Sequence, residues 1–387
     1  MQQGNNKMCL RLITPVNVGD GTVLGAKDYL YNASQQKVYF LNIAAWHKFI
    51  YEHELLGKYE VYLQNFREKQ NLLNWLQAQG YSLQDVQGCI TGEAFAEVNT
   101  VKAAEKQTVN DINRHIQHFD GSLYVPGSSI KGVFRTAILY KLLLEKPAVR
   151  ARYWQAVNAE INKPYFKPRI SLNRITASLE SELLHTLHLE NNGKEVKKFN
   201  AVCSSLRGLQ VSDTYDSKNM QVAVLQKIDV GFDKYGKASP RGDLPIFREC
   251  MLPGVELYFD VKLDKTMLTT VGINSIEELL DCVQDFFYAV LRLLEDAFGD
   301  DCPQLFRNIE GANMFLGSNT GFLSKTLLVM LAPDDEAAKN TIKSLLDKSF
   351  KMHKHLLRDK IIAPRTLKCT TYKGELVLMG LAEVRKA

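Results

Sequence analysis

The chain has 387 residues, which is enough for two domains or for one domain with large insertions. Hydrophobic residues make up 45% of it and charged residues 24%, as in an ordinary globular protein, so a largely disordered chain is excluded. The net charge is only +5. No apolar run approaches the roughly 18 residues that a membrane-spanning helix needs, which excludes a transmembrane protein.

The seven cysteines favour a reduced protein without a structural zinc site. They are odd in number and widely scattered, and they form no C-x-x-C pair, whereas disulfide frameworks and zinc sites need paired spacings. The N-terminus also lacks the apolar core of a secretion signal. We therefore expect a cytoplasmic chain with no metal ion, no cofactor and no membrane contact.

The first part of the chain is predicted to form short strands and then helices. Strands are expected at residues 8–14 and 37–42, and a sharp glycine turn at 14–21 follows the first of them. Residues 46–87 look helical and do not continue the strand pattern. We interpret them as an insertion.

The strongest local signal is the segment 124–139, YVPGSSIKGVFRTAIL. Its Pro-Gly pair predicts a tight turn after a strand, and either Ser128 or Ser129 is expected to cap the helix that follows. Gly132 leaves space for another backbone to approach. The segment therefore predicts a strand, a tight turn and a helix.

Lys131 and Arg135 lie four residues apart on one face of this helix. Such a like-charge pair destabilises a helix slightly unless an anion compensates it. Because the free amide groups at a helix N-terminus also attract anions, phosphate is the ligand that the segment suggests. An ordinary capped helix with surface cations is the alternative.

The second part of the chain combines further strands with helices and a long loop. Residues 151–198 look helical and are interpreted as a second insertion. Short strands are expected at 209–212, 221–230 and 375–384. Residues 231–245 are predicted to form a long loop, which at this length is more often functional than structural.

Two neighbouring elements of the second part carry clear periodicity. Apolar and polar residues alternate over 255–263, which predicts a strand with one buried face. A broad apolar stripe over 275–298 predicts a long helix, with Ser275 and Glu278 as its capping box. Strands in succession with separate amphipathic helices favour an α+β fold over a doubly wound parallel sheet.

A second glycine-rich turn, GANMFLGSNTGFLSKT, occupies residues 311–326. Its glycines and small polar residues would let a sugar-phosphate chain touch the backbone, with a lysine nearby as a point charge. The spacing of that lysine does not fit a Walker loop, and the chain has no G-x-G-x-x-G. The residues with this expected role are Gly317, Ser318, Asn319, Gly321 and Lys325.

Basic residues are concentrated in two windows. Residues 124–175 hold ten Lys and Arg against two Glu, and residues 339–387 hold twelve against four acidic residues. A polyanionic partner is one interpretation of these windows. A pair of solvated surface faces explains them equally well.

Catalytic signals are sparse. Asp20 and Asp28, in and just after the first glycine turn, could activate a ribose 2′-hydroxyl or hold a metal ion. Aspartate is also common in turns because its carboxylate accepts hydrogen bonds from nearby backbone, and we favour that interpretation.

Several blocks of the sequence resemble the RAMP superfamily of CRISPR-associated proteins. Those blocks are LITPVNVGDG, LYVPGSSIKGVFRTAIL, LQVSDTY, PIFRECMLPGVELYFDVKLD, LGSNTGFLSKT and PRTLKCTTYKGELVLMGLAEV, and they run nearly from end to end. Their order is most similar to that of the capping backbone subunit of the Csm-type (type III-A) effector complex.

The resemblance implies a fold of tandem ferredoxin-like, RRM-related modules with helical and loop insertions. We expect an N-terminal module at 1–200, with insertions at about 46–110 and 151–200, and a C-terminal module at 201–387.

The implied role is to bind the 3′-proximal part of the CRISPR RNA (crRNA) and to close the filament of backbone subunits, without catalysis. Other backbone subunits and the nucleases that mature the crRNA are the implied protein partners. The residues that the resemblance assigns to RNA contacts are Gly127, Ser128, Ser129, Lys131, Arg135, Gly317, Asn319, Gly321 and Lys325. We predict further RNA contacts from Gly132, Arg248 and Ser318.

The alternative function is that of a RAMP endoribonuclease. Asp20 or Asp28 is then the positional analogue of the catalytic aspartate in the repeating backbone subunit, acting with a divalent metal ion. His47 lies where a general-base histidine of other RAMP proteins could lie. Nothing in the sequence completes a site around any of the three.

Overall fold

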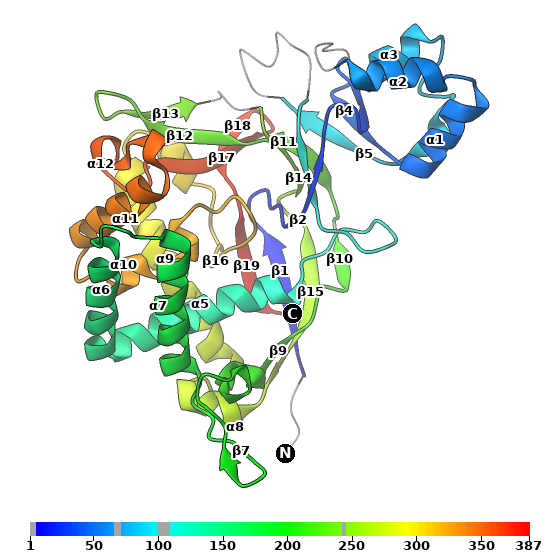
Figure 1. Cartoon of the computed structure of the whole chain (residues 1–387). Helices are drawn as coiled ribbons and strands as arrows, with labels where there is room; N and C mark the ends of the chain where they lie inside the picture. Colours follow the sequence, from blue (N-terminus) through cyan, green and yellow to red (C-terminus); the bar gives the residue numbers. More distant parts are fainter. Residues whose placement is uncertain (1–4, 66–70, 99–108, 242–244) are drawn as a thin grey trace.

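The computed structural model of the chain describes residues 5–65, 71–98, 109–241 and 245–387. Its described residues form a mixed fold of sheets and packed helices (Figure 1), which confirms the α+β class. None of the described helices is long and apolar enough to cross a membrane.

The first sheet contains the first and the last strand of the described residues. β1 lies at its centre and pairs antiparallel with β15 on one side and with β19 on the other. The strands in order are β10 (Asp216–Lys218), β15 (Glu256–Leu263), β1 (Asn5–Leu12), β19 (Leu381–Lys386) and β16 (Met314–Phe315), with β9 (Leu209–Val211) also paired to β15.

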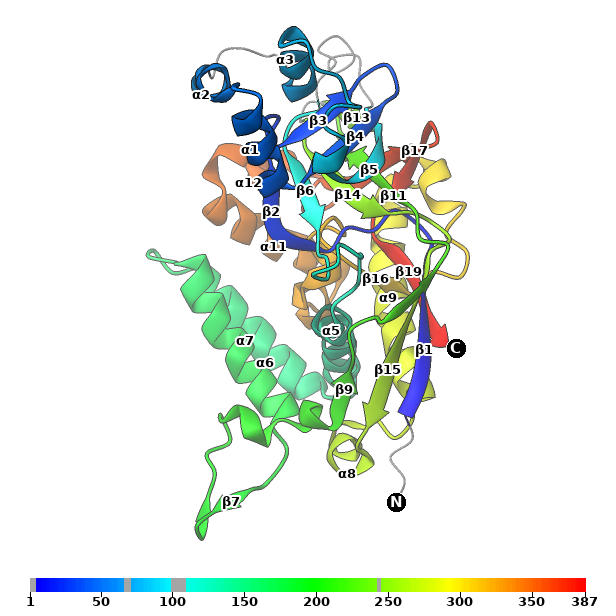
Figure 2. The same ribbon diagram turned by 90° about the vertical axis from the view of Figure 1, so that its right-hand side faces the viewer.

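Two long helices cover this sheet. Their apolar side chains share one core with Leu10 of β1 and Phe259 of β15, and Figure 2 shows the two helices close to these strands. They are α5 (Gly127–Glu145) and α9 (Ile276–Phe298). The predicted strand at 255–263 and the predicted helix at 275–298 are thus confirmed within one residue.

The capping box of α9 consists of the predicted residues, but one of its two hydrogen bonds has a different backbone partner. Ser275 accepts a hydrogen bond from the Glu278 N–H, as expected. The Glu278 carboxylate reaches one residue further back and accepts from the Asn274 N–H at 2.6 Å. Both ends of the box therefore still satisfy backbone donors at the start of the helix.

The second sheet has seven strands and also combines distant parts of the sequence. It holds β6 beside β14 and β11 beside β5, both pairs parallel. Its order is β2 (Gly19–Leu24), β6 (Ile112–His115), β14 (Phe247–Met251), β11 (Val222–Gln226), β5 (Ile90–Glu97), β4 (Lys37–Leu41) and β3 (Tyr29–Asn32).

Three helices between β4 and β5 form a lobe with a core of its own. That core is rich in aromatic residues and rests on Leu30 and Tyr39 of the second sheet, and Figure 1 shows the lobe at the upper right. The helices are α1 (Ile43–Glu52), α2 (Leu56–Gln64) and α3 (Leu72–Ala78). The expected first insertion, 46–110, is partly helical as predicted, but its later part includes β5, a strand of the sheet.

A third sheet lies beside the C-terminal helices. Its order is β13 (Ala238–Arg241), β12 (Ile228–Phe232), β17 (Thr366–Tyr372) and β18 (Glu375–Leu378). The prediction of a loop at 231–245 is wrong for its described part, because β12 and β13 pair as an antiparallel hairpin. Pro240 lies in β13 at the edge of this sheet, where a missing backbone N–H costs no ladder bond.

Apart from the short helix α8, which lies near β9, the remaining helices lie on one side of the molecule (Figure 1). Figure 2 shows α6 and α7 as a pair that extends away from the sheets and leads to a small ribbon. The elements are α6 (Pro147–Ile161), α7 (Pro168–Leu184), α8 (Lys265–Leu268), α10 (Leu328–Leu331), α11 (Asp335–Ser349) and α12 (His355–Arg358), and the ribbon is β7 (Glu190–Asn191) with β8 (Lys194–Glu195).

The predicted module boundary at residue 200 separates strands that belong to the same sheets. Each of the first two sheets takes strands from both sides of this position. The two-module division therefore stays a prediction about the sequence, and neither half builds the first two sheets alone.

Candidate nucleic-acid interface

The second glycine motif is positioned by the first glycine turn, some 300 residues earlier in the chain. The Ser318 N–H donates to the Asn17 carbonyl at 2.8 Å. Gly317 has φ +93°, and a Cβ there would lie 2.3 Å from the Asn17 carbonyl oxygen. Glycine is needed at 317 because the two backbones touch, so this glycine serves a contact inside the chain.

The side chain of Asn17 joins three segments of the sequence. Its amide donates to the Glu249 carbonyl at 2.8 Å, and its Oδ1 accepts from the Ser318 hydroxyl at 2.6 Å. Arg248 Nη1 donates to Ser318 Oγ at 3.1 Å and approaches Asn17 Oδ1 at 3.4 Å. Asn17, Arg248, Ser318 and Lys325 together are called the Arg248 cluster below.

The cations of this cluster are electrostatically unsatisfied. Burial lowers the pKa of Arg248, and its buried Nε has no hydrogen-bond partner among the described residues. Lys325 reaches the surface, yet desolvation and the charge of Arg248 both lower the pKa of its ammonium group. Neither residue forms an ion pair with any carboxylate in the described part of the chain, so an anion such as phosphate would relieve both.

Arg248 and the next residue, Glu249, lie on opposite faces of β14. The Glu249 carboxylate is buried and accepts hydrogen bonds from Arg114 Nε at 2.7 Å and from the His115 N–H at 3.0 Å. Burial raises the pKa of Glu249 despite Arg114, and burial lowers the pKa of His115 to about 4. Because successive side chains alternate along a strand, this network anchors β14 to β6 while Arg248 faces the cluster.

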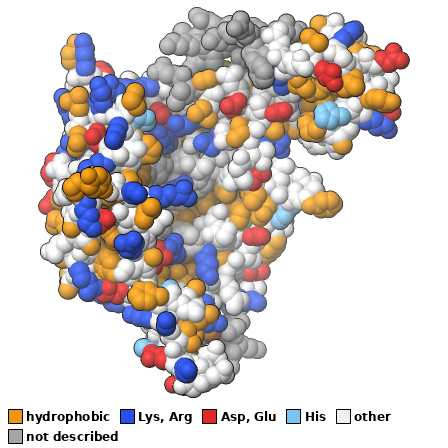
Figure 3. Space-filling model, viewed as in Figure 1, with side chains coloured by type: hydrophobic (Ala, Val, Ile, Leu, Met, Phe, Trp, Pro, Cys, Tyr) orange, Lys and Arg blue, Asp and Glu red, His pale blue; other side chains and the backbone are white. Residues whose placement is uncertain are grey.

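The face seen in Figure 3 is hollowed at its centre. Lys and Arg side chains follow the left rim of the hollow, and one reaches across it. A concave surface with basic rims suits an extended polyanion better than a small ligand.

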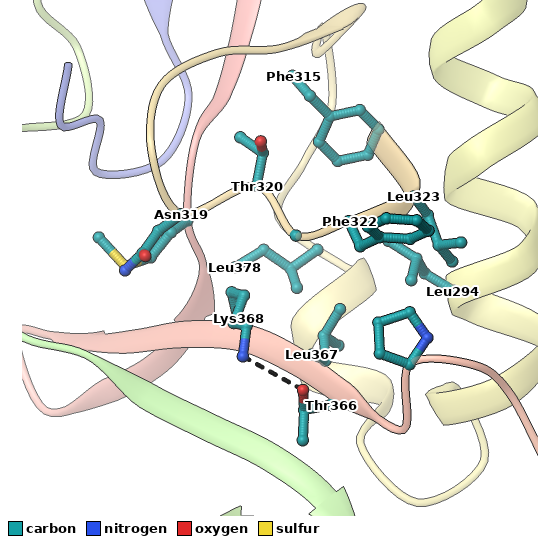
Figure 4. Close-up of a pocket in the computed structure, with 13 residues that line it drawn as sticks. Leu294, Phe315, Asn319, Thr320, Phe322, Leu323, Thr366, Leu367, Lys368 and Leu378 are labelled. Atoms are coloured by element: carbon teal, nitrogen blue, oxygen red, sulfur yellow. Dashed lines mark hydrogen bonds between the residues drawn. The ribbon is translucent and has the colours of Figure 1, made fainter. Parts of the chain in front are cut away.

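The space behind the second glycine motif is not a ligand pocket. Figure 4 shows it between the 319–323 loop and β17, with Lys368 hydrogen-bonded to Thr366. Its volume is about 20 Å³, enough for one water molecule. Asn319 is buried there and donates to the Met379 sulfur at 3.0 Å, so its side chain is used inside the chain.

The first glycine motif is tied to the LQVSDTY block. The prediction that Ser128 or Ser129 caps the helix is wrong: α5 begins at Gly127, and its N–H donates to the Asp213 carboxylate at 2.7 Å. A Cβ at Gly127 would lie 2.4 Å from the Val211 carbonyl oxygen. The distant Asp213 performs the capping because the turn brings the two segments into contact.

The two cations of this motif have partners within the chain. Lys131 donates to the carbonyls of Leu206 at 2.9 Å and Leu209 at 2.6 Å, and burial lowers its pKa. Arg135 forms an ion pair with Glu180 of α7. The like-charge repulsion on this helix is thus relieved without a ligand, whereas Ser128 and Gly132 leave open surface.

The structure does not bring all predicted site residues together. Within the described ranges, no hydrogen bond or ion pair joins the α5 motif to the Arg248 cluster. The structure brings Arg248 and Ser318 of the second glycine motif into contact, and it adds Asn17 of the first glycine turn, which the sequence did not single out. The sequence carries no signal for Asn17 beyond its place in that turn, because its burial and its hydrogen bonds follow from the fold.

The candidate catalytic residues are engaged in turns or stand apart. Asp20 accepts from the Thr22 N–H at 2.7 Å and Asp28 from the Gly25 N–H at 2.7 Å, which is the turn role that the sequence favoured. His47 is exposed on α1, in the helical lobe. Among the described residues, no group of three or more His, Cys, Asp or Glu is placed to hold a metal ion.

All seven cysteines are buried and unpaired. Desolvation raises the pKa of several of them, including that of Cys282 to about 11, which keeps their thiols protonated and unreactive.

The chain is similar to known proteins over nearly its full length. The family model for the RAMP superfamily matches residues 9–348. The protein called "CRISPR system Cms protein Csm5" from Streptococcus thermophilus is 25% identical over 325 residues, which covers 83% of this chain and 79% of the relative. The protein of the same name from Mycobacterium tuberculosis is 24% identical, covering 98% and 96%.

Two solved structures share the fold. One is a chain of the cryo-EM structure of a Csm-crRNA-target RNA ternary complex in a type III-A CRISPR-Cas system, with a TM-score of 0.67, 18% identity, and coverage of 99% of this chain and 100% of that one. The other is the crystal structure of T. onnurineus Csm5, with a TM-score of 0.59, 17% identity, and coverage of 97% and 99%.

Proposed function

Because the chain belongs to the RAMP superfamily, we propose that it is a non-catalytic, RNA-binding subunit of a type III-A CRISPR effector complex. In this role it binds the 3′-proximal part of the crRNA, caps the filament of backbone subunits and supports crRNA maturation in antiviral defence. Its partners are the crRNA, the other backbone subunits and the maturation nucleases. The similarity to Csm5 proteins over most of each chain supports this assignment.

The observation that carries the proposal is the Arg248 cluster. Two cations without carboxylate partners in the described residues lie beside a glycine loop, and one of them has a buried N–H without a partner. Arg248 offers its remaining donors to a phosphate, and Lys325 adds a point charge. Such contacts hold an RNA backbone and carry no base information, which suits a subunit that must accept any spacer sequence.

The α5 motif contributes a second contact region in this proposal. Its exposed Ser128 and the open surface at Gly132 admit a sugar-phosphate backbone close to the helix. The residues assigned to RNA in this region are Gly127, Ser128, Ser129, Lys131, Gly132 and Arg135.

The test is RNA binding across a salt series. The purified chain should bind two unrelated single-stranded RNAs with similar affinity, and the logarithm of that affinity should fall with the logarithm of salt by about 0.7 per phosphate neutralised. Arg248→Gln and Lys325→Gln should each lower the affinity for both RNAs and reduce the salt slope by about one such contact. Lys58→Gln, on the exposed side of α2, is the matched control and should change neither.

Two results would contradict the proposal. A salt-independent affinity, or equal binding by the Arg248→Gln and Lys58→Gln variants, would remove the RNA-binding role of the cluster. RNA fragments that require Mg²⁺ and disappear in Asp28→Ala or Asp20→Ala would make the protein an endoribonuclease instead. Thermal melting of each variant shows whether the fold is retained.

A further inference from the structure

An exposed apolar surface with a basic border lies at the C-terminal end of α11. We call it the α12 patch. Met352 is 88% exposed and Leu357 is 67% exposed, and a contiguous exposed apolar surface often marks a site of protein–protein interaction. Its apolar members are Phe350, Met352, Leu356, Leu357 and Ile361, and its cations are Lys351, Lys354, Arg358 and Lys360.

The patch is held in shape from below by a buried network. His355 Nδ1 lies 2.8 Å from one carboxylate oxygen of Asp359, and Arg365 Nη1 lies 2.6 Å from the other. Asp359 is fully buried. The Leu356 N–H also donates to Asp347 at 3.2 Å, which ties the start of α12 to α11. The surface is therefore preformed, so a partner would not have to order it.

The cations of the patch have no carboxylate partner among the described residues. Many other cations of the basic window at 339–387 do form ion pairs. Lys339, Lys368, Arg385 and Lys386 each form an ion pair inside the chain. The two acidic groups close to the patch, Asp347 and Asp359, are already engaged. On the face shown in Figure 3, Lys and Arg intermingle with hydrophobic side chains at the upper left, where Figure 1 places α11 and α12.

We propose that the α12 patch docks an acidic amphipathic helix of a partner protein. The apolar members would cover the apolar face of that helix, and the surrounding cations would pair with its carboxylates. Four of the five apolar side chains are aliphatic, and aliphatic groups do not provide the stacking platforms with which proteins hold RNA bases. The inference concerns a surface outside the Arg248 cluster and does not depend on the proposed RNA contacts.

The test uses the purified full-length chain and a fluorescent peptide of about 15 residues, long enough for a marginal helix. The peptide carries leucines at i, i+3, i+4 and i+7 with glutamates beside them. A second peptide replaces the glutamates by lysines, and a single-stranded RNA and vesicles with anionic lipid are separate probes. Of the two peptides, fluorescence anisotropy should detect binding of the acidic one only.

Two patch variants should weaken that binding at least about tenfold. Met352→Ser/Leu357→Ser removes apolar area, and Lys351→Glu/Arg358→Glu reverses charge, in both cases at exposed positions. Leu56→Ser/Val61→Ser, at α2 positions that are 50% and 67% exposed, and Lys58→Glu/Lys194→Glu are the matched controls and should bind normally.

The outcomes separate this inference from the RNA-binding proposal. It is overturned if the acidic peptide does not bind, if it binds no better than the basic peptide, or if the patch variants bind it as well as the controls do. It is also overturned if the patch variants lose binding to RNA or vesicles and not to the peptide. Retained RNA affinity in the patch variants, with lost peptide affinity, is the expected result.

Discussion

Gly317 and Gly321 show how two glycines of one motif can differ in purpose. Both have positive φ, at +93° and +83°. A Cβ at 317 would collide with the backbone of Asn17, whereas a Cβ at 321 would meet nothing within 4 Å. The sequence presented both as places where RNA approaches the backbone, and only the second has space for such an approach.

This difference leads to a prediction at the scale of residues. Gly321→Ala should lower the free energy of unfolding by about 1–2 kcal/mol, the cost of a left-handed backbone for an ordinary residue. Gly317→Ala should cost more, because it must also push the loop away from Asn17, and it should weaken RNA binding by displacing Ser318 and Lys325. Chemical denaturation and anisotropy measure the two effects, and equal losses in both variants would contradict the packing role of Gly317.

Asn17 was not predictable as a site residue because its importance lies in partners from 230 and 300 positions away. The same is true of the Glu249, Arg114 and His115 network behind Arg248. Each of these residues has an ordinary local sequence, and only strand pairing of β6 with β14 brings them together. Arg248 was predictable because it lies in one of the sequence blocks that resemble the RAMP superfamily. That its Nε has no hydrogen-bond partner among the described residues was not predictable.

Among the elements, α5 depends on a cap that local sequence rules did not identify. The rules favoured a serine at the start of the helix, but Pro126 occupies the N-cap position and offers no side-chain acceptor. Asp213, more than 80 residues later, supplies the carboxylate. A negative charge at this position also interacts favourably with the helix dipole.

We therefore expect Asp213→Ala to lower the free energy of unfolding by about 1 kcal/mol. Asp213→Asn should cost less, because the amide oxygen can still accept from the Gly127 N–H while the charge is lost. Urea denaturation of the two variants and the wild type measures this order. An Asp213→Ala variant as stable as the wild type would show that water caps the helix equally well.

Elements with strong periodicity were predicted well. β15 and α9 have patterns of two and of 3.6 residues that admit one interpretation each, and both ended where expected. The β12–β13 hairpin was missed because its turn residues, Asp233 to Lys237, and Pro240 resemble a loop when pairing with β17 is unknown. Strand pairing is not visible in a single short segment.

In the molecule as a whole, the first two sheets each combine strands from both halves of the sequence. β1, from the first residues described, lies between β15 and β19, from the last third of the chain. Removing either half would leave unpaired central edges and an exposed apolar core.

Fragments 1–200 and 201–387 should therefore not fold when expressed alone. Each is expected to show poorly dispersed amide resonances and rapid proteolysis, and co-expression should restore a protease-resistant complex of the two. Two fragments that fold separately would instead support independent modules with the predicted boundary. The intact chain treated under the same conditions is the control.

Local patterns and blocks of recognisable order were sufficient to predict the mixed α+β class, the RAMP superfamily, the positions of the strongly periodic elements and the two glycine motifs. Which cations are used inside the chain, and which have no carboxylate partner, is visible only in the folded molecule. Lys131 and Arg135 have internal partners, whereas Arg248 and Lys325 have no carboxylate partners among the described residues. The physical reason is that charge neutralisation and hydrogen bonding depend on distances between segments far apart in the sequence, and no local pattern specifies those distances.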